Sequence, residues 1–276
     1  MASIGKINGI ALASIGKINS RTLADNDKVI GIIKPATGSD EVYLNETFQG
    51  LSRYGYGFSP TNWRTTSDTV YGSTAADRAW SSDIGGTTPS GATGPTNGHG
   101  GGYNASDGAE ATSTPGDEYM HVEATNQFNK RFLMRTPELD FSNALANDTL
   151  KLHFWFHMYG SNMGNLGVAA TDNSTSAGDD TLGKHFTSDT AGGLTMTYWD
   201  DASDDGSSTA TGVRITGQQQ TAGHGTATTA AHWRKATVDL NDLAGQSSVY
   251  IWFFSKSGAQ FRSDCSIDDV AVVGQE

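Results

Sequence analysis

The chain has 276 residues, with 18 Lys and Arg against 30 Asp and Glu, which gives a net charge of −12 and a pI near 4.9. Binding to nucleic-acid phosphates or to an anionic membrane surface requires clustered Lys and Arg, and the sequence has no such cluster. Charged residues make up only 17% of the chain while Gly contributes 34 residues, and this composition favours strands and turns over helices.

The first residues form an internal repeat, because residues 2–9 (ASIGKING) return as residues 13–20 (ASIGKINS). The Asn8–Gly9 pair between apolar residues is typical of a hairpin turn. We therefore predict that residues 1–34 form an extended or hairpin arm, with a disordered tail as the alternative, separate from a domain spanning residues 35–276. Apolar side chains of the arm need another surface to cover them, and we expect them to anchor it: Ile4, Ile7, Ile10, Leu12, Ile15 and Ile18.

Beyond the arm, short apolar segments alternate with turn residues, which predicts strands over residues 42–48, 119–123, 150–159, 193–199, 232–240, 249–254 and 266–273. At most a single helical turn is expected, at residues 239–243. The long Gly, Ser, Thr and Asp stretches at residues 85–116 and 171–180 are expected to be surface loops, too polar to pack. The predicted fold class is all-β.

The segment 150–159 shows the clearest alternation. A period of two places its side chains on opposite faces of a strand, which predicts a core face and an outer face that is either covered by a loop or left as a platform. The two sets are Leu152, Phe154, Phe156 and Met158 for the core and His153, Trp155, His157 and Tyr159 for the outer face. On such a strand His153 and His157 lie roughly 13 Å apart, too far to share one zinc ion.

Residues 154–168 resemble the signature strand and turn of MAM domains, the jelly-roll sandwiches of meprins and receptor phosphatases. Further segments resemble the family pattern in the same order: residues 93–96 (TGPT), 118–123, 132–139, 233–240 and 263–270. The resemblance implies a MAM-like jelly-roll β-sandwich, from about residue 43, that mediates adhesion or assembly without catalysis. The disulfide cysteines of animal members are absent, since Cys265 is the single cysteine.

In a sandwich of this type the first and last strands lie near each other at one edge. Glu46, Asp117 and Asp268 could supply the oxygen ligands of a structural Ca²⁺ there, with solvated carboxylates as the alternative. Gln49 stands where the resemblance leads one to expect an acidic residue. No other cofactor is predicted.

Enzyme motifs are absent from the sequence, which has no G-x-S-x-G elbow, H-E-x-x-H or C-x-x-C. His121 and Glu123 lack the partner cysteines of a zinc deaminase, and Cys265 is expected to be a small buried hydrophobe. We predict that the protein is not an enzyme, although paired carboxylates for glycoside cleavage stay open. Trp80 and Tyr103, beside Gly-rich loops, are the candidate surface contacts for a ligand such as a host-surface glycan, with a simple packing role as the alternative.

The arm repeat is similar to short repeats in structural proteins of marine bacteriophages. The first residues lack the apolar core of a secretory signal, and no apolar run is long enough to span a bilayer, so synthesis in a host cytoplasm is expected. We therefore predict a bacteriophage virion protein on the particle surface, either a capsid decoration or spike or a tail fibre or adhesion protein. Its expected partners are other virion proteins and further copies of itself. The alternative is a cell-surface or secreted carbohydrate-binding or adhesion module.

Overall fold

A computed structural model describes backbone and side chains for residues 41–51, 62–65, 78–83, 93–100, 102, 117–144, 149–172, 214–220 and 233–274. For some further short strands it describes the backbone alone. The chain divides into two compact units, Met1–Asp40 with Gln275–Glu276, and Glu41–Gly274. The sequence analysis placed this division six residues earlier, after residue 34.

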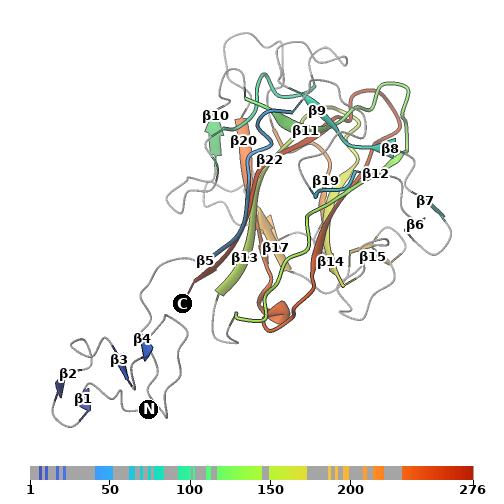
Figure 1. Ribbon diagram of the computed structural model, residues 1–276. Helices are drawn as coiled ribbons and strands as arrows, with labels where there is room; N and C mark the ends of the chain where they lie inside the picture. Colours follow the sequence, from blue (N-terminus) through green and yellow to red (C-terminus); the bar gives the residue numbers. More distant parts are fainter. Residues whose placement is uncertain are drawn as a thin grey trace. The chain divides into compact units, whose positions relative to one another are not determined.

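The larger unit is a sandwich of two β-sheets (Figure 1). The large sheet has the strand order β18 (Ser208–Thr209), β17 (Thr195–Tyr198), β20 (His232–Asp239), β13 (Thr149–Met158), β22 (Cys265–Gln275), β11 (Tyr119–Val122) and β9 (Ser81–Asp83). In addition, β10 (Glu110–Thr112) pairs with β20, and β5 (Glu41–Glu46) pairs with β22.

The small sheet has the order β19 (Arg214–Thr216), β14 (Asn165–Thr171), β21 (Tyr250–Lys256), β12 (Arg131–Arg135) and β8 (Arg78–Ala79). Two further hairpins pair β6 (Thr69–Val70) with β7 (Thr74–Ala75) and β15 (Phe186–Thr187) with β16 (Thr190–Ala191). The described residues include one 3₁₀ turn, η2 (Asn241–Leu243), where the sequence predicted a single turn. No helix among the described residues is long and apolar enough to cross a membrane.

The predicted all-β fold is confirmed, and each predicted strand segment contains a strand of one of the two sheets. The alternation on β13 is confirmed as well. Its inward side chains lie in the core between the sheets with no exposed surface: Leu152, Phe154, Phe156 and Met158. Burial of these four large side chains stabilises the centre of the sandwich. Each Å² of apolar surface removed from water contributes about 25 cal/mol to the free energy of folding.

Strands β12 and β14 were not among the predicted strands. All residues of β14 except the first are buried, and three successive residues of β12 are buried. A strand buried on both faces loses the period-two pattern that marks a half-exposed strand. These strands could therefore not be recognised from alternation.

The smaller unit contains two hairpins of the same register. In the first, β1 (Lys6–Ile7) pairs with β2 (Ile10–Ala11), so that Ile7 lies opposite Ile10. In the second, β3 (Lys17–Ile18) pairs with β4 (Arg21–Thr22), and Ile18 lies opposite Arg21. Each sequence repeat therefore contains the first strand of one hairpin, whereas the predicted turn residues Asn8 and Gly9 lie outside the described residues.

Candidate functional site

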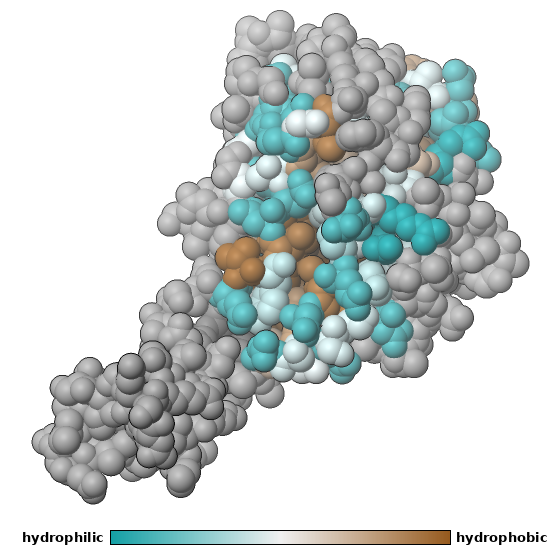
Figure 2. Space-filling model, in the orientation of Figure 1, coloured by the Kyte–Doolittle hydropathy of each residue, from teal (hydrophilic) through white to brown (hydrophobic). Residues whose placement is uncertain are grey.

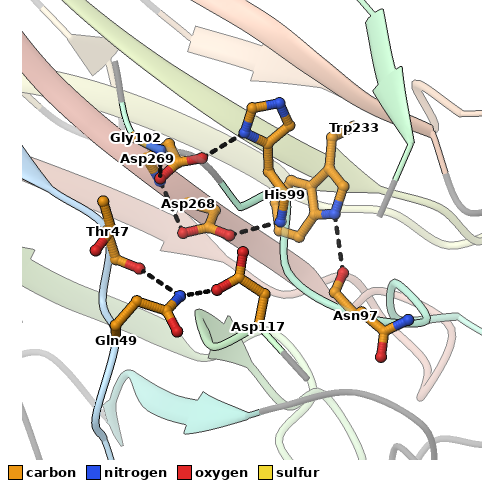
Figure 3. Close-up of polar contacts among 9 residues, drawn as sticks. All are labelled: Thr47, Gln49, Asn97, His99, Gly102, Asp117, Trp233, Asp268 and Asp269. Carbon is orange, nitrogen blue, oxygen red and sulfur yellow. Dashed lines mark hydrogen bonds and ion pairs between the residues drawn. The ribbon is translucent and has the colours of Figure 1, made fainter. Parts of the chain in front are cut away.

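The outer face of the large sheet carries an aromatic cluster of Tyr119 on β11, Trp155 on β13 and Trp233 on β20, all buried. Residues 93–100 and 102, called here the covering loop, lie over this cluster. The Tyr119 hydroxyl donates to the Pro95 carbonyl at 3.4 Å, and the Trp233 indole N–H donates to the Asn97 carbonyl at 2.9 Å (Figure 3). The outer face of β13 is therefore covered by a loop, one of the two predicted outcomes.

His99 completes this cover. Its imidazole stacks on the Trp155 indole with ring centroids 4.0 Å apart and an angle of 16° between the planes. The prediction that residues 85–116 are too polar to pack is wrong for the covering loop, because Thr93, Gly94, Pro95, Gly98 and His99 are buried. The loop can pack because its hydrogen-bonding groups find partners on the sheet, which removes the usual penalty for burying polar backbone.

Two adjacent carboxylates at the centre of β22 hold the loop in place. Asp268 accepts the backbone N–H of His99 at 2.6 Å and that of Asp269 at 2.8 Å. Asp269 accepts the Gly102 N–H at 3.0 Å and also bonds the His99 ring nitrogen Nδ1 (Figure 3). Both residues of the pair thus fasten the same loop.

Local backbone geometry lets neighbouring residues reach one loop. Ile267 and Val270 both lie in the core, so the inward alternation of β22 skips a residue between them. Asp269 has a φ of +44°, in the left-handed region. This combination is characteristic of a bulge, which redirects a side chain that would otherwise point to the other face.

The loop backbone lies directly against this pair. A Cβ atom added to Gly98 would come within 2.8 Å of Asp268 Oδ2 and 2.9 Å of the Glu118 carbonyl. Glycine is therefore required at position 98 by close approach. The Gly98 N–H also donates to the Asp117 carbonyl at 3.0 Å.

Several carboxylates lie beside the covering loop, close enough for their negative charges to contribute to raised pKa values. Burial, followed by the charges of Asp269 and Asp117, raises the pKa of Asp268 well above its ordinary value. Partial burial and the charge of Asp269 raise the pKa of Asp117. The site is therefore electrostatically suited to a proton or a cation.

The structure brings two of the three predicted Ca²⁺ ligands together. Asp117 lies close enough to Asp268 for its charge to contribute to the raised pKa of Asp268. Glu46 lies elsewhere: it pairs with the buried Val270, its Oε1 accepts the Phe48 N–H at 2.8 Å, and its carboxylate interacts with the Trp63 side chain. The Ca²⁺ site stays a prediction, with Asp117 and Asp268 as the pair that the structure places side by side.

Gln49 has a specific role at this point. Its side-chain amide donates to the Thr47 carbonyl at 3.1 Å and to Asp117 Oδ1 (Figure 3). An acidic residue at this position would add a cation ligand, whereas the amide supplies a hydrogen-bond donor to the carboxylate.

The prediction that Trp80 is a surface contact is wrong, because Trp80 has no exposed surface and belongs to the core. It lies between β8 of the small sheet and β9 of the large sheet, where the chain crosses from one sheet to the other. A side chain at such a crossing falls between the sheets. Tyr103 lies outside the described residues, as do the predicted anchoring residues Ile4, Leu12 and Ile15, while only the backbone is described for Ile7, Ile10 and Ile18.

The remaining sequence interpretations concern single residues. His153 Nδ1 lies 2.9 Å from the Thr237 hydroxyl, and His157 packs edge-on against Trp233 with centroids 6.0 Å apart. Cys265 is buried as predicted, and burial raises the pKa of its thiol. Asp269 and His99 were not predicted as site residues, because no local pattern shows which loop will meet the centre of β22.

Comparison with known proteins places the fold in context. No protein family matches the sequence, and no curated protein is significantly similar to it. Among solved structures, the K3 cleaved adhesin domain of Lys-gingipain from Porphyromonas gingivalis is 18% identical, with 85% of this chain and 99% of that chain covered and a TM-score of 0.39. The K2 adhesin domain of Lys-gingipain is 15% identical, covering 85% of this chain and 97% of that chain with a TM-score of 0.41.

A cyclase from Fischerella sp. TAU is 13% identical, covering 86% of this chain and 98% of that chain with a TM-score of 0.34. Adhesin domains and an enzyme thus stand side by side at similar levels of likeness.

Proposed function

We propose that the protein is a non-enzymatic bacteriophage virion protein, displayed on the particle surface as a decoration, spike or fibre component and attached through its N-terminal arm. The observation that carries this proposal is the arm itself, a unit that contains two hairpins of the same register. The similarity of its repeat to structural proteins of marine bacteriophages supports the kind of particle.

Physical reasoning about the hairpins supports an anchoring role. Each hairpin pairs strands of two residues, and isolated two-stranded hairpins are marginally stable in water. The repeated isoleucines need a surface that covers them, and exposed strand edges readily pair with another chain. Other virion subunits or further copies of this chain would supply that surface.

The described polar residues of the sandwich support a role without catalysis. Asp268 and Asp269 are used to fasten the covering loop, and the two nucleophilic side chains at the start of β22, Cys265 and Ser266, are 1% and 0% exposed. A nucleophile must reach its substrate, and these two cannot. The face in Figure 2 shows hydrophilic residues around small apolar patches, as suits a surface in contact with solvent.

Light scattering on the full-length chain and on a variant lacking residues 1–34 tests the anchoring role. The deletion leaves β5, which begins at Glu41, intact. We expect the full chain to form oligomers or larger assemblies and the deletion variant to be a folded monomer with an unchanged melting temperature. A matched pair refines the result: I7S/I18S should weaken assembly, and K6S/K17S, which changes the neighbouring strand residues, should do so less.

If the deletion variant assembles as the full chain does, or enters virions normally, the anchoring role is wrong. If the full-length chain and the deletion variant are both monomers, a stand-alone module is favoured instead.

A carbohydrate-binding or adhesion module is the second candidate, and one observation gives it a location. Phe128 and Phe261 are 41% and 43% exposed, which is unusual for large aromatic side chains. Their loops adjoin, because the Asn129 N–H donates to the Gly258 carbonyl at 2.9 Å. Exposed aromatic rings can stack on sugars, so glycan binding by the isolated sandwich that is lost in F128A/F261A would favour this candidate.

A further inference from the structure

A second polar cluster lies on the outer face of the large sheet. His121 and Glu123 are two residues apart at β11 and face the same side, and Asp264 directly precedes β22. The three residues are 2%, 6% and 1% exposed, and one ligand atom from each lies within 4.8 Å of the others. Among the described residues, no other group of three or more His, Cys, Asp or Glu side chains converges this closely.

A hydrogen bond to one atom orients each of the three side chains. His121 Nδ1 lies 2.9 Å from the Ser266 hydroxyl. Glu123 Oε1 accepts the Thr125 N–H at 2.7 Å, and Asp264 Oδ1 accepts the Ala124 N–H at 3.0 Å. Side chains that bind a metal are typically oriented by such hydrogen bonds.

The opposite atom of the imidazole has no such partner. His121 Nε2 is buried and makes no hydrogen bond, and it lies 3.9 Å from Glu123 Oε2, beyond hydrogen-bonding distance. A buried ring nitrogen without a hydrogen bond is unfavourable, because it has lost its contact with water and gained no partner. A metal ion between these atoms would satisfy it.

The electrostatic surroundings point the same way. The carboxylates of Glu123, Asp264 and Asp83 all act on the imidazole of His121 with their negative charge. Asp83 on β9 is itself fully buried. The cluster therefore attracts positive charge at the position of the imidazole.

The same residues also contain the order of a Ser–His–acid relay, with Ser266, His121 and Glu123 in succession. Ser266 has no exposed surface, however, and a serine nucleophile must be reached by its substrate. Closed burial of nitrogen and oxygen ligands suits a structural metal site instead.

We propose that His121, Glu123 and Asp264 bind a divalent transition-metal ion of the Zn²⁺ class. Zn–N and Zn–O bonds of about 2.0–2.2 Å place two ligands of a tetrahedral site about 3.3 Å apart, so the 3.9 Å separation of Nε2 and Oε2 needs to close by less than about 1 Å. Imidazole with carboxylates favours such an ion over Ca²⁺, which prefers oxygen ligands alone.

The site would stabilise the fold at a point where distant segments meet. Asp264 also bonds the Thr93 hydroxyl, at the beginning of the covering loop. A metal ion would thus tie β11, the start of β22 and the covering loop together. Binding to the folded chain alone raises the free energy of unfolding by mass action.

Full-length protein, stripped of metal with a chelator, is titrated with Zn²⁺ in a calorimeter and with Co²⁺ under visible absorption. We expect one equivalent of each ion at this site, a higher melting temperature with Zn²⁺, and Co²⁺ absorption bands typical of nitrogen and oxygen ligands. H121Q should lose the Co²⁺ bands and bind Zn²⁺ at least about 100-fold more weakly, since even loss of a supporting hydrogen bond costs 10–100-fold.

H153Q is the matched control, because His153 lies on the same sheet and bonds Thr237. It should bind both ions as the unchanged protein does. D117N separates this site from the predicted Ca²⁺ site and should also leave Zn²⁺ binding unchanged. If H121Q does not fold, E123Q takes its place.

Absence of Zn²⁺ binding by the stripped protein, or equal binding by H121Q, would overturn the proposal. Neither outcome depends on the virion role, because both are read on the purified chain.

Discussion

The two polar clusters on the outer face of the large sheet use the same residue types in different ways. In the first, Asp268 and Asp269 direct their oxygens at the backbone N–H groups and the imidazole of the covering loop. In the second, hydrogen bonds orient His121, Glu123 and Asp264, and one ligand atom of each side chain converges with the others. Asp264 contributes to both arrangements, because it also accepts the Thr93 hydroxyl of the covering loop, whereas the carboxylates of the first cluster face no unbonded imidazole nitrogen.

Removal of the Asp269 carboxylate should have the largest effect on stability. D269A leaves the Gly102 N–H and the His99 ring without their acceptor, and hydrogen bonds to charged groups contribute about 1.5–3 kcal/mol each. The left-handed φ of +44° adds strain for alanine. We expect a loss of about 3 kcal/mol in the free energy of unfolding, measured by denaturant titration.

D269N is the control for this change, because asparagine tolerates a left-handed backbone and keeps one acceptor. It should lose clearly less stability than D269A. Equal and small losses in both variants would mean that Asp269 does not fasten the loop.

A substitution of Gly98 tests the packing of the loop rather than its hydrogen bonds. In G98A the new methyl group would lie 2.8 Å from Asp268 Oδ2 and 2.9 Å from the Glu118 carbonyl, so the loop must move away from β22. Overpacking of this kind typically lowers stability by about 1–3 kcal/mol. Increased quenching of Trp155 and Trp233 fluorescence by iodide would report the loss of cover.

G217A is the matched comparison, because a Cβ there meets no atom within 4 Å although φ is +76°. Its effect should be limited to backbone strain, with unchanged tryptophan quenching. If G98A matches G217A in both measurements, the loop does not lie as close to β22 as described.

The smallest expected effect is on the pH dependence of stability. Because the pKa of Asp268 is raised in the folded chain, the folded state holds this proton more tightly than the unfolded state. Stability should therefore fall as the pH rises from about 3.9, the ordinary Asp value, through the raised pKa. In EDTA, D268N should show a shallower decline of the melting temperature over this range.

The comparison uses the slope of the melting temperature against pH and not the melting temperature itself. An asparagine side chain has one acceptor oxygen and cannot accept both backbone N–H groups that bond to Asp268.

The same variant tests the predicted Ca²⁺ site at Asp117 and Asp268. Ca²⁺ should raise the melting temperature of the unchanged protein at neutral pH and have little effect on D268N. A melting temperature that is the same in EDTA and in Ca²⁺ would exclude this site.

The sequence by itself determined features that depend on near neighbours along the chain. Alternation placed Phe154 in the core and Trp155 on the outer face, and the Asn8–Gly9 pair predicted a hairpin where β1 pairs with β2. Composition alone indicated an all-β fold. These features follow from local backbone geometry, in which a period of two fixes the face of each side chain.

Tertiary structure decided which segments meet. Only the crossing between β8 and β9 buried Trp80, and only the left-handed backbone at Asp269 let adjacent carboxylates fasten one loop. Pairing of β11 with the start of β22 brought His121 near Asp264, 143 positions later in the sequence. Local patterns specify the face of a strand but not its neighbours, because strand order depends on the packing of the whole sandwich.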